Sequence, residues 1–300
     1  MSNEKNPLAA MLAQYENNNK PKYEKKEKPK GDDVLKNYFN VFLKDGVNTA
    51  TKTIRILPTE DGSSPFVEVH FHKGEINGED KKFACLKEEK GEACPFCEAR
   101  ELLLATGEES KKEMAKKYKA RMMYVVKVID RDNEADGVKF WRFNHDFRNE
   151  GIYDKIYALI NAIKKDITHA DTGRDIVLTI NRNQNKIPVV SGIATLDPTP
   201  LTDDAAKKQE WLTDNRTWED VFPPKPYDFL EIIVRGLTPV WDKEAKKFVA
   251  KETDTVSDET KQLDSELTMG LETVKNNVQA ASTPASTPAE STADNDDLPF

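Results

Sequence analysis

The chain has 300 residues and a formal net charge of −8; charged residues make up 33% of it and hydrophobic residues 37%. This length suits one large domain or two small ones, and this composition indicates that one part of the chain builds a core and another part does not. No apolar run approaches the roughly 20 residues of a membrane-spanning helix, and no hydrophobic signal region opens the chain. We therefore expect a cytoplasmic protein without a membrane partner.

The N-terminal stretch, residues 1–35, is expected to lie outside the folded core. Asn6 can cap a short helix in which Pro7 suits the first position and the apolar residues share one face. Such a helix is too short to be stable alone, so it is expected to dock on the core or on a neighbouring copy of the chain. Residues 20–30 contain six lysines, two glutamates and two prolines, and these predict an extended basic arm.

From residue 36 to residue 250 the sequence predicts a folded core. Residues 53–58 form an apolar run closed by proline, and residues 64–72 alternate between apolar and polar side chains, so both are expected to be strands. Residues 121–144 consist of two β-rich runs around a polar, glycine-containing turn, which predicts a hairpin.

The second half of this core continues in the same way. Residues 152–163 have apolar side chains at helical spacing, and residues 175–194 predict a second hairpin. We expect a helix at 202–218, whereas 228–237 is ambiguous between helix and strand. Many short strands with an inserted helix predict a fold that is mainly β with inserted helices, in the form of a small, partly open antiparallel barrel.

All three cysteines of the chain lie within thirteen positions, shortly after two histidines. Cys94 and Cys97 form a CxxC knuckle, Cys85 comes from the loop before it, and His72 comes from a strand. The pattern His-x12-Cys-x8-Cys-x2-Cys supplies the four ligands of a tetrahedral zinc site. Four protein ligands leave no open position for a substrate, so we predict one structural zinc ion per chain.

Three other interpretations of this cluster remain open. His70 shares the face of His72 and is the rival ligand, although His72 lies nearer the loop. The cysteines could also be thiols without a metal, or a redox CxxC pair, but a redox motif is expected after a strand in a βαβ unit, and here a charged loop precedes it. A helix predicted over residues 98–110 would pack on the site.

The sequence shows no motif that would make it an enzyme. It lacks a phosphate loop of the form GxxxxGK[ST] and a nucleophile elbow of the form GxSxG. The acidic pairs Asp32-Asp33 and Asp203-Asp204 lie in polar sequence, which favours a solvated or capping role over metal binding. We therefore predict a binding protein.

Nucleic acid is the ligand that the basic runs suggest. Residues 111–127 carry seven basic residues and one acid, and residues 139–143 interleave cations with aromatic rings. Single strands need this combination, because cations follow the phosphates while rings stack on bases of any sequence. In the alternative interpretation the cations form a solvated face and the rings belong to the core. The candidate contacts are Lys116, Lys117, Tyr118, Lys119, Arg121, Tyr124, Lys139, Trp141, Arg142 and Phe143.

Several stretches together resemble a known family, the T-even-type phage single-stranded DNA-binding proteins. They are TIRILP followed by SPF, the zinc pattern ending in CPFC, VKFWRF, IYDKIYALI and, more weakly, VSGIATLD, and they span residues 53–197. The resemblance implies an OB-type antiparallel barrel with a small zinc-binding subdomain beside a cleft for single-stranded DNA. It implies the same four zinc ligands, and it places Arg55, the basic run up to Arg121, and Trp141-Arg142 along that cleft.

The chain departs from the family pattern in three places. The spacing between the loop cysteine and the knuckle is one residue shorter. Arg121-Met122 stands where the family has an aromatic pair, which puts stacking there in doubt. The short basic N-terminal motif that the family uses for contacts between neighbours is not visible, and residues 20–30 are the candidate substitute for such self-association.

The last fifty residues hold all of the excess negative charge. Residues 251–300 contain three lysines and eleven acidic residues, so residues 1–250 have no net charge. We predict a largely disordered acidic tail. Its tip, DNDDLPF, is similar to the tip of bacterial single-stranded DNA-binding proteins, which docks on replication and repair partners. The candidate partner-binding residues are Asp296, Asp297, Leu298, Pro299 and Phe300.

These observations predict three segments: an N-terminal helix and basic arm (1–35), an OB-type core (36–250) with a zinc subdomain at about 66–110, and the acidic tail (251–300). The expected function is sequence-independent binding of single-stranded DNA in phage replication, recombination and repair, with replication and recombination proteins recruited by the tail. The alternatives are a zinc-ribbon accessory subunit of a primase or nuclease, and a single-stranded RNA-binding protein.

Overall fold

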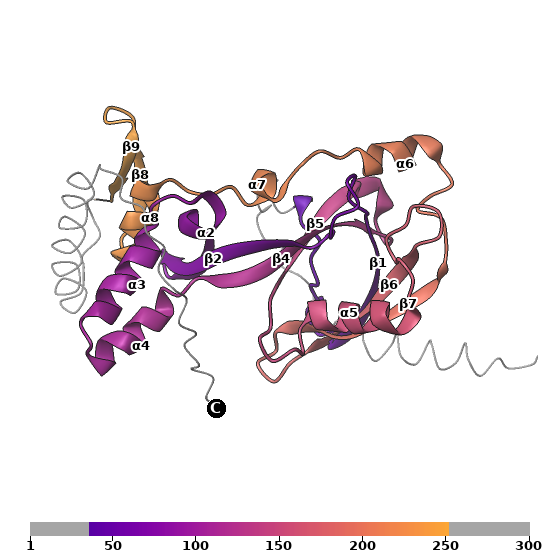
Figure 1. The fold of residues 1–300 in the computed structure, drawn as a ribbon, viewed down its shortest axis with the longest axis horizontal. Coiled ribbons are helices and arrows are strands. Elements are labelled where there is room, and N and C mark those ends of the chain that lie inside the picture. The colour runs from indigo at the N-terminus through magenta and orange to yellow at the C-terminus, as the bar shows by residue number, and fades with distance from the viewer. Residues whose placement is uncertain (1–35, 252–300) are drawn as a thin grey trace, which may run out of the picture.

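The computed structural model describes residues 36–251. The predicted N-terminal helix, the basic arm and the acidic tail with its Pro299-Phe300 end lie outside the described residues. Figure 1 shows an elongated arrangement in which a strand-rich part, holding β1 and β5 to β7, is joined to a smaller, helix-rich part by β2 and β4. None of the helices within residues 36–251 has the length and apolar content needed to cross a membrane.

Seven antiparallel strands form the main sheet, in the order β3-β2-β4-β1-β6-β7, with β5 paired to β4. The strands are β1 (Thr49–Ile56), β2 (Val67–Ile76), β3 (Glu79–Ala84), β4 (Arg121–Asp130), β5 (Val138–Asn144), β6 (Arg174–Arg182) and β7 (Pro188–Pro198). Both predicted hairpins are present, as β4–β5 and β6–β7. The fold is therefore mainly β and antiparallel, with helices inserted between the strands, as predicted.

Strand β4 connects the two parts because it changes partner along its length. Its first half pairs with β2, its last residues pair with β1, and β5 lies along β4 as a further partner. The turn between β4 and β5 contains the short 3-10 helix η2 (Glu134–Asp136). As a result, residues on β2 and β4 belong to both parts of the molecule.

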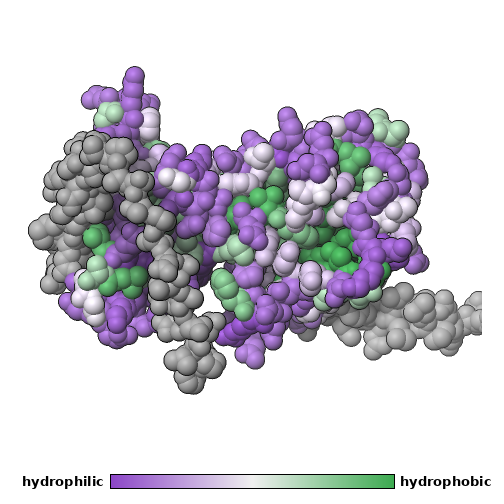
Figure 2. Space-filling model, viewed as in Figure 1, coloured by the Kyte–Doolittle hydropathy of each residue, from purple (hydrophilic) through white to green (hydrophobic). Residues whose placement is uncertain are grey.

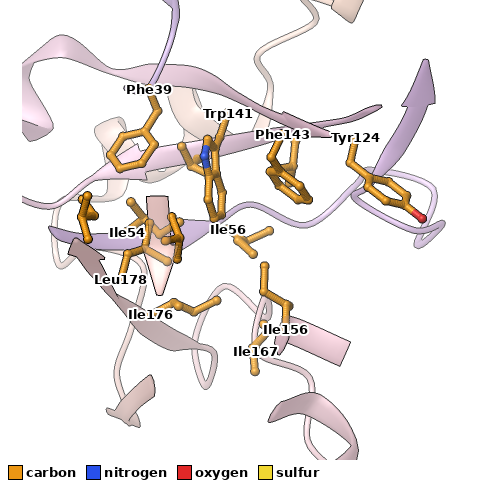
Figure 3. Packing of buried hydrophobic residues seen from close by; sticks show 14 of the residues in the cluster. Phe39, Ile54, Ile56, Tyr124, Trp141, Phe143, Ile156, Ile167, Ile176 and Leu178 are labelled. Atoms are coloured by element: carbon orange, nitrogen blue, oxygen red, sulfur yellow. The ribbon is translucent and has the colours of Figure 1, made fainter. Parts of the chain in front are cut away.

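The largest buried cluster lies in the strand-rich part (Figure 3), where some hydrophobic residues are also visible between hydrophilic ones in the space-filling view (Figure 2). Ile54 of β1, Trp141 of β5 and Leu178 of β6 meet there, and α5 (Ile152–Ile163) closes the cluster with Ile156. The helix begins where Asp154 accepts a hydrogen bond from the backbone N–H of Gly151. Because the strands bury alternate residues and α5 buries one face, the apolar spacing seen in the sequence accounts for this core.

The helix-rich part is built on the β2–β3 hairpin. Its helices are α2 (Leu86–Lys90), α3 (Pro95–Ala105), α4 (Glu109–Lys117) and α8 (Tyr227–Val234). Phe83, Phe96, Leu230 and Ile233 form its small buried cluster. A Cβ atom on Gly74 of β2 would lie 2.6 Å from Cγ2 of Ile233, so only glycine allows α8 to approach the strand this closely.

Two local predictions need correction. The charged loop before Cys94 contains α2. The single helix expected at 202–218 is divided into α6 (Ala205–Leu212) and α7 (Trp218–Val221), because Thr217 and Asp220 form a capping box that begins a new helix.

The segment 228–237, ambiguous from the sequence, belongs mostly to α8, which buries Leu230, Ile232, Ile233 and Val234. The hairpin of β8 (Pro239–Asp242) and β9 (Lys247–Ala250) follows it.

Candidate metal centre and nucleic-acid surface

Four side chains of the helix-rich part meet in one cluster. The ligand atoms of His72, Cys85, Cys94 and Cys97 all lie within 4.8 Å of one another. The Nε2 atom of His72 is 3.5 Å from Sγ of Cys94 and 3.6 Å from Sγ of Cys97, and the Sγ atoms of Cys85 and Cys97 are 3.6 Å apart. A tetrahedral zinc ion with bonds of about 2.3 Å to sulfur and 2.0 Å to nitrogen separates its donor atoms by roughly 3.5–3.8 Å. The donor set and its spacing therefore fit zinc.

Local structure explains how the three cysteines come together. Cys85 follows β3 and caps α2, where its sulfur accepts from the backbone N–H of Glu88. Gly91 ends α2 with a φ of 67°, a conformation that glycine adopts readily. Cys94 is the cap of α3, and Cys97 lies in the first turn of that helix. The chain thus changes direction between α2 and α3, and this brings the sulfurs of the three cysteines together.

The imidazole of His72 is held in one orientation. Its Nδ1 lies 2.9 Å from the carbonyl oxygen of Tyr118, which can only accept, so Nδ1 carries the hydrogen and Nε2 faces the sulfurs. Its ring stacks on Phe96 with centroids 4.8 Å apart. A second-sphere hydrogen bond of this kind is what fixes the tautomer of a metal-bound histidine.

The side chains of this cluster shift one another's pKa values. Burial lowers the pKa of His72, but hydrogen bonds and negative charge at Cys85 and Cys94 outweigh burial and raise it to about 9. The pKa of Cys94 is held far below its usual range by hydrogen bonds to Cys85 and Cys97, while contact with the other two sulfurs raises the pKa of Cys97. These four side chains by themselves therefore favour ionisation of one cysteine thiol over ionisation of a second. A divalent cation is what allows all three thiols to ionise together.

The rival histidine lies outside this cluster. Nδ1 of His70 is 3.0 Å from Oε1 of Glu89, and the backbone N–H of His70 donates to the same oxygen. Of the two histidines, the structure brings His72 to the cysteines and pairs His70 with α2.

Four cations gather on the adjoining strands, and we call them the cation cluster: Lys73, Lys82, Arg121 and Arg142. Lys73 of β2 faces Lys82 of β3, Arg121 of β4 faces Phe71 of β2, and Arg142 lies on β5. None of the four has a carboxylate within ion-pair distance among residues 36–251. Unneutralised cations this close repel one another.

Lys82 is the member of the cluster whose pKa responds to both burial and the neighbouring cations. Burial, and then the charges of Arg142, Lys73 and Arg121, lower its pKa to about 8. Its ammonium lies over the ring of Phe71 at 4.5 Å and donates to Oδ1 of Asn144 at 2.7 Å, so only neutral groups compensate it. An anion bound here would reduce the repulsion among the four cations.

Arg142 is held for contact by two rings. Its guanidinium lies 4.2 Å from the centroid of Tyr38 and 5.6 Å from that of Phe222, the residue that follows α7. The hydroxyl of Tyr38 donates to the carbonyl oxygen of Val221. The segment after β7 therefore passes over β5 and fixes the arginine between two aromatic side chains.

The aromatic residues predicted to stack on bases are in the core instead. Trp141 is 2% exposed, Phe143 7% and Tyr124 4%. Trp141 contacts Phe39 edge to face, and Tyr124 stacks on Tyr153. Because these rings fill the main cluster, they present no free face on which a base could stack.

Tyr118 is also unsuited to stacking on bases. It is partly buried, packs near Phe96, and its carbonyl oxygen holds His72, so it serves the metal centre.

Arg55 is likewise not a surface residue. It is fully buried, with Nε 2.7 Å from Oδ1 of Asp175 and Nη2 donating to the backbone and hydroxyl oxygens of Thr199. Arg131 binds the same carboxylate oxygen. The anionic partner that a buried arginine needs is thus Asp175, and the predicted place of Arg55 in a DNA cleft is wrong for this structure.

The remaining predicted cations lie outside the cation cluster. Lys116 pairs with Glu113, and Lys139 pairs with Asp136 at 2.6 Å. Lys117 and Lys119 are exposed at the end of α4 and just after it.

Sequence reasoning thus found Arg121 and Arg142 of the cluster and missed the lysine pair. The signal for that pair was the turn Asn77-Gly78, which fixes the register of β2 against β3. Both turn residues have positive φ, as a two-residue hairpin turn requires.

Comparison with known proteins places the chain in a family. The family model described as gp32 DNA binding protein like matches residues 44–216, which is more than half of the chain and includes the four clustered ligands and the cation cluster. Among curated proteins, none matches the chain.

Proposed function

The chain belongs to the gp32-like family of DNA-binding proteins, and we propose that it binds single-stranded DNA without sequence preference. The observation that supports this most directly is the cation cluster. Lys73, Lys82, Arg121 and Arg142 lie close together without a carboxylate partner among the described residues, and one of them has lost much of its basicity. A row of phosphates supplies the missing negative charge, and phosphates carry no sequence information.

Binding then works by charge neutralisation and pre-orientation. Phosphates that approach the cluster release their counterions and relieve the repulsion between the facing lysines. The guanidinium of Arg142 is already fixed between Tyr38 and Phe222, so little rotational freedom is lost on contact. Affinity is expected to fall steeply with salt, with a slope of about −0.7 per phosphate contacted on a single strand.

We further propose that the four clustered donors hold one structural zinc ion. His72, Cys85, Cys94 and Cys97 would bind it, and its role is to stabilise a part of the molecule that has only a small buried cluster of its own. With four protein ligands the ion has no position for a substrate.

The zinc proposal has a matched test. Purified protein should contain one zinc per chain by elemental analysis, and Cys94→Ser should lose it, because a serine hydroxyl is a poor ligand. His70→Ala, which removes the neighbouring histidine outside the cluster, should keep the metal. Loss of zinc in His70→Ala together with its retention in His72→Ala would exchange the roles of the two histidines.

The wider biological role rests on the family resemblance and on the sequence. In this proposal the core is an OB-type barrel over 36–250 with the zinc subdomain at about 66–110, and the protein coats and protects exposed strands during phage replication, recombination and repair in the host cytoplasm. The acidic tail recruits replication and recombination proteins through the residues of its DNDDLPF tip, while the N-terminal 35 residues mediate contacts between neighbours on the strand.

A single set of titrations tests the binding proposal. Oligo(dT), duplex DNA and poly(U) of equal length are compared at fixed salt by fluorescence anisotropy. We expect tight binding to oligo(dT) and much weaker binding to the duplex. The oligo(dT) titration should follow a single binding isotherm, and its affinity should depend on the salt concentration. Tighter binding to poly(U) would make the protein an RNA binder, and metal-dependent cleavage or primer synthesis on DNA would make it part of an enzyme.

A further inference from the structure

With its predicted stacking rings buried, the protein needs other rings if bases are to stack. The large aromatic side chains that are exposed within residues 36–251 are Phe42, Phe147, Tyr157 and Trp241. Phe147 is 73% exposed and lies in the loop between β5 and α5, directly after the strand that carries Arg142. That loop is the one place where an exposed ring continues a strand of the cation cluster.

Phe147 stands at the edge of an open groove of about 700 Å³. Apolar side chains line it from three directions, among them Val41 before β1, Phe143 of β5 and Val189 of β7. The ring of Phe147 meets His145 edge to face with centroids 4.6 Å apart, and Nδ1 of His145 lies 3.3 Å from the hydroxyl of Tyr124. The exposed ring is therefore supported from behind by groups that are anchored in the core.

The groove adjoins the cation cluster through one hydrogen bond. Asn144 is a lining residue of the groove, and its Oδ1 accepts from the ammonium of Lys82 at 2.7 Å. Asn144 therefore links Lys82 to the groove directly, so a DNA strand whose phosphates contact Lys82 passes close to the groove.

The charge of the groove differs from that of the cation cluster. Two cations, Arg148 and Lys155, and two carboxylates, Asp146 and Glu150, line it, so its formal charge is zero. A neutral, partly apolar groove suits an uncharged planar group better than it suits a phosphate.

From these contacts we propose that the groove between β5, α5 and β7 receives a nucleobase of the bound strand, stacked on Phe147, while the adjoining phosphates lie on the cation cluster. The proposal rests on the proposed single-stranded DNA binding and adds a base subsite to it. Stacking on a ring is tolerant of sequence because every base has a π-face, so this subsite agrees with binding that does not read sequence.

The test compares four variants on oligo(dT). Phe147→Ala should weaken binding about 5- to 150-fold, the range for loss of one base–ring stack, and Phe147→Tyr should bind as the native protein does. Tyr157→Ala is the matched control: Tyr157 is a 62% exposed ring on α5 that does not line the groove, and its removal should leave affinity unchanged. Lys82→Ala removes a phosphate contact instead.

Two further readings separate stacking from charge. Phe147→Ala should leave the salt slope unchanged, whereas Lys82→Ala should make it shallower by about 0.7. On an oligonucleotide of abasic sites, the difference between the native protein and Phe147→Ala should disappear. Because the rings of Phe147 and Tyr157 are exposed, the variants at these two positions should keep the native melting temperature.

Each contrary result points to a different failure. If Phe147→Ala binds oligo(dT) as tightly as the native protein while Lys82→Ala is weakened, the base subsite is wrong and the proposed function stands. If the loss in Phe147→Ala is equally large on abasic oligonucleotide, the ring acts without a base and the inference is overturned. If the native protein does not bind oligo(dT), the proposed function and this inference both fail.

Discussion

Lys82 offers the most direct way to test whether the cation cluster contacts DNA. Its pKa is lowered to about 8 by burial and by Arg142, Lys73 and Arg121. A phosphate beside it would supply the missing negative charge and return its pKa toward the ordinary value of about 10.4. Binding then takes up a proton whenever the free lysine is neutral, so affinity should fall as pH rises through 8.

The size of this effect follows from the two pKa values. With a pKa of about 8 the free side chain is roughly 90% charged at pH 7 and roughly 10% charged at pH 9, whereas a side chain at about 10.4 stays almost fully charged over this range. Affinity for oligo(dT) should therefore fall about tenfold between pH 7 and pH 9. The fall would be smaller if the phosphate restores the pKa only in part.

The assay is a set of oligo(dT) titrations at constant ionic strength between pH 6.5 and pH 9.5, with Lys82→Arg as the matched control. An arginine at position 82 keeps its charge throughout this range, so the pH dependence should disappear while binding persists. A pH dependence that comes from a titratable group elsewhere in the protein, including the tail, would remain in this variant. The same tenfold fall in Lys82→Arg would refute the assignment of the effect to Lys82 and remove the main support for its contact with DNA.

The remaining predictions concern stability and the metal. Lys82→Met should raise the free energy of unfolding of the DNA-free protein at pH 7, because the charged lysine is less favourable in the folded state than in the unfolded state. This gain should shrink as pH rises through 8, and urea denaturation at pH 7 and pH 9.5 measures both effects. Trp141→Ala should destabilise by about 3–5 kcal/mol, since it empties a site that is 2% exposed; a stable variant with weakened oligo(dT) binding would instead make Trp141 a surface platform. Asp175→Ala should destabilise by about 3 kcal/mol or more, because it leaves Arg55 charged, buried and short of its carboxylate, and an unchanged melting temperature would contradict this ion pair. Acidification should release zinc as the cysteine ligands take up protons, and a chelator-coupled absorbance assay should show release at higher pH for His72→Ala than for His70→Ala.

Local sequence signals predicted the hairpins, the helix at 152–163 and the grouping of the cysteines. A CxxC knuckle before a proline-started helix brings its sulfurs together whatever surrounds it, and a polar turn between two apolar runs pairs those runs. These features depend on neighbours in the chain, so a single sequence contains enough information to place them.

Whether the aromatic rings of β5 are buried depends on contacts between residues that lie far apart in the sequence. The alternation along β5 places Phe140 on one face and Trp141 and Phe143 on the other, but alternation alone does not show that both faces are covered. Tyr38 bridges to Phe140 on one face and Phe39 packs on Trp141 on the other, so a short segment before β1 buries the strand on both sides. Only the pairing of distant segments decides which rings remain for a ligand.

The β2–β3 ribbon joins the two proposed activities within a few residues. On β2, the candidate ligand His72 is followed directly by Lys73. On the facing strand, Lys82 lies three positions before the candidate ligand Cys85, which follows the end of β3. Two like charges push these strands apart, and a metal bound at His72 and Cys85 would clamp the same strands at their shared end. By thermodynamic reciprocity, if bound metal raises the affinity for phosphates, bound phosphates must raise the affinity for the metal by the same factor. Zinc affinity measured by equilibrium competition with a chelator, with and without oligo(dT), would show this coupling directly: an unchanged affinity would mean that the ribbon does not couple the two sites.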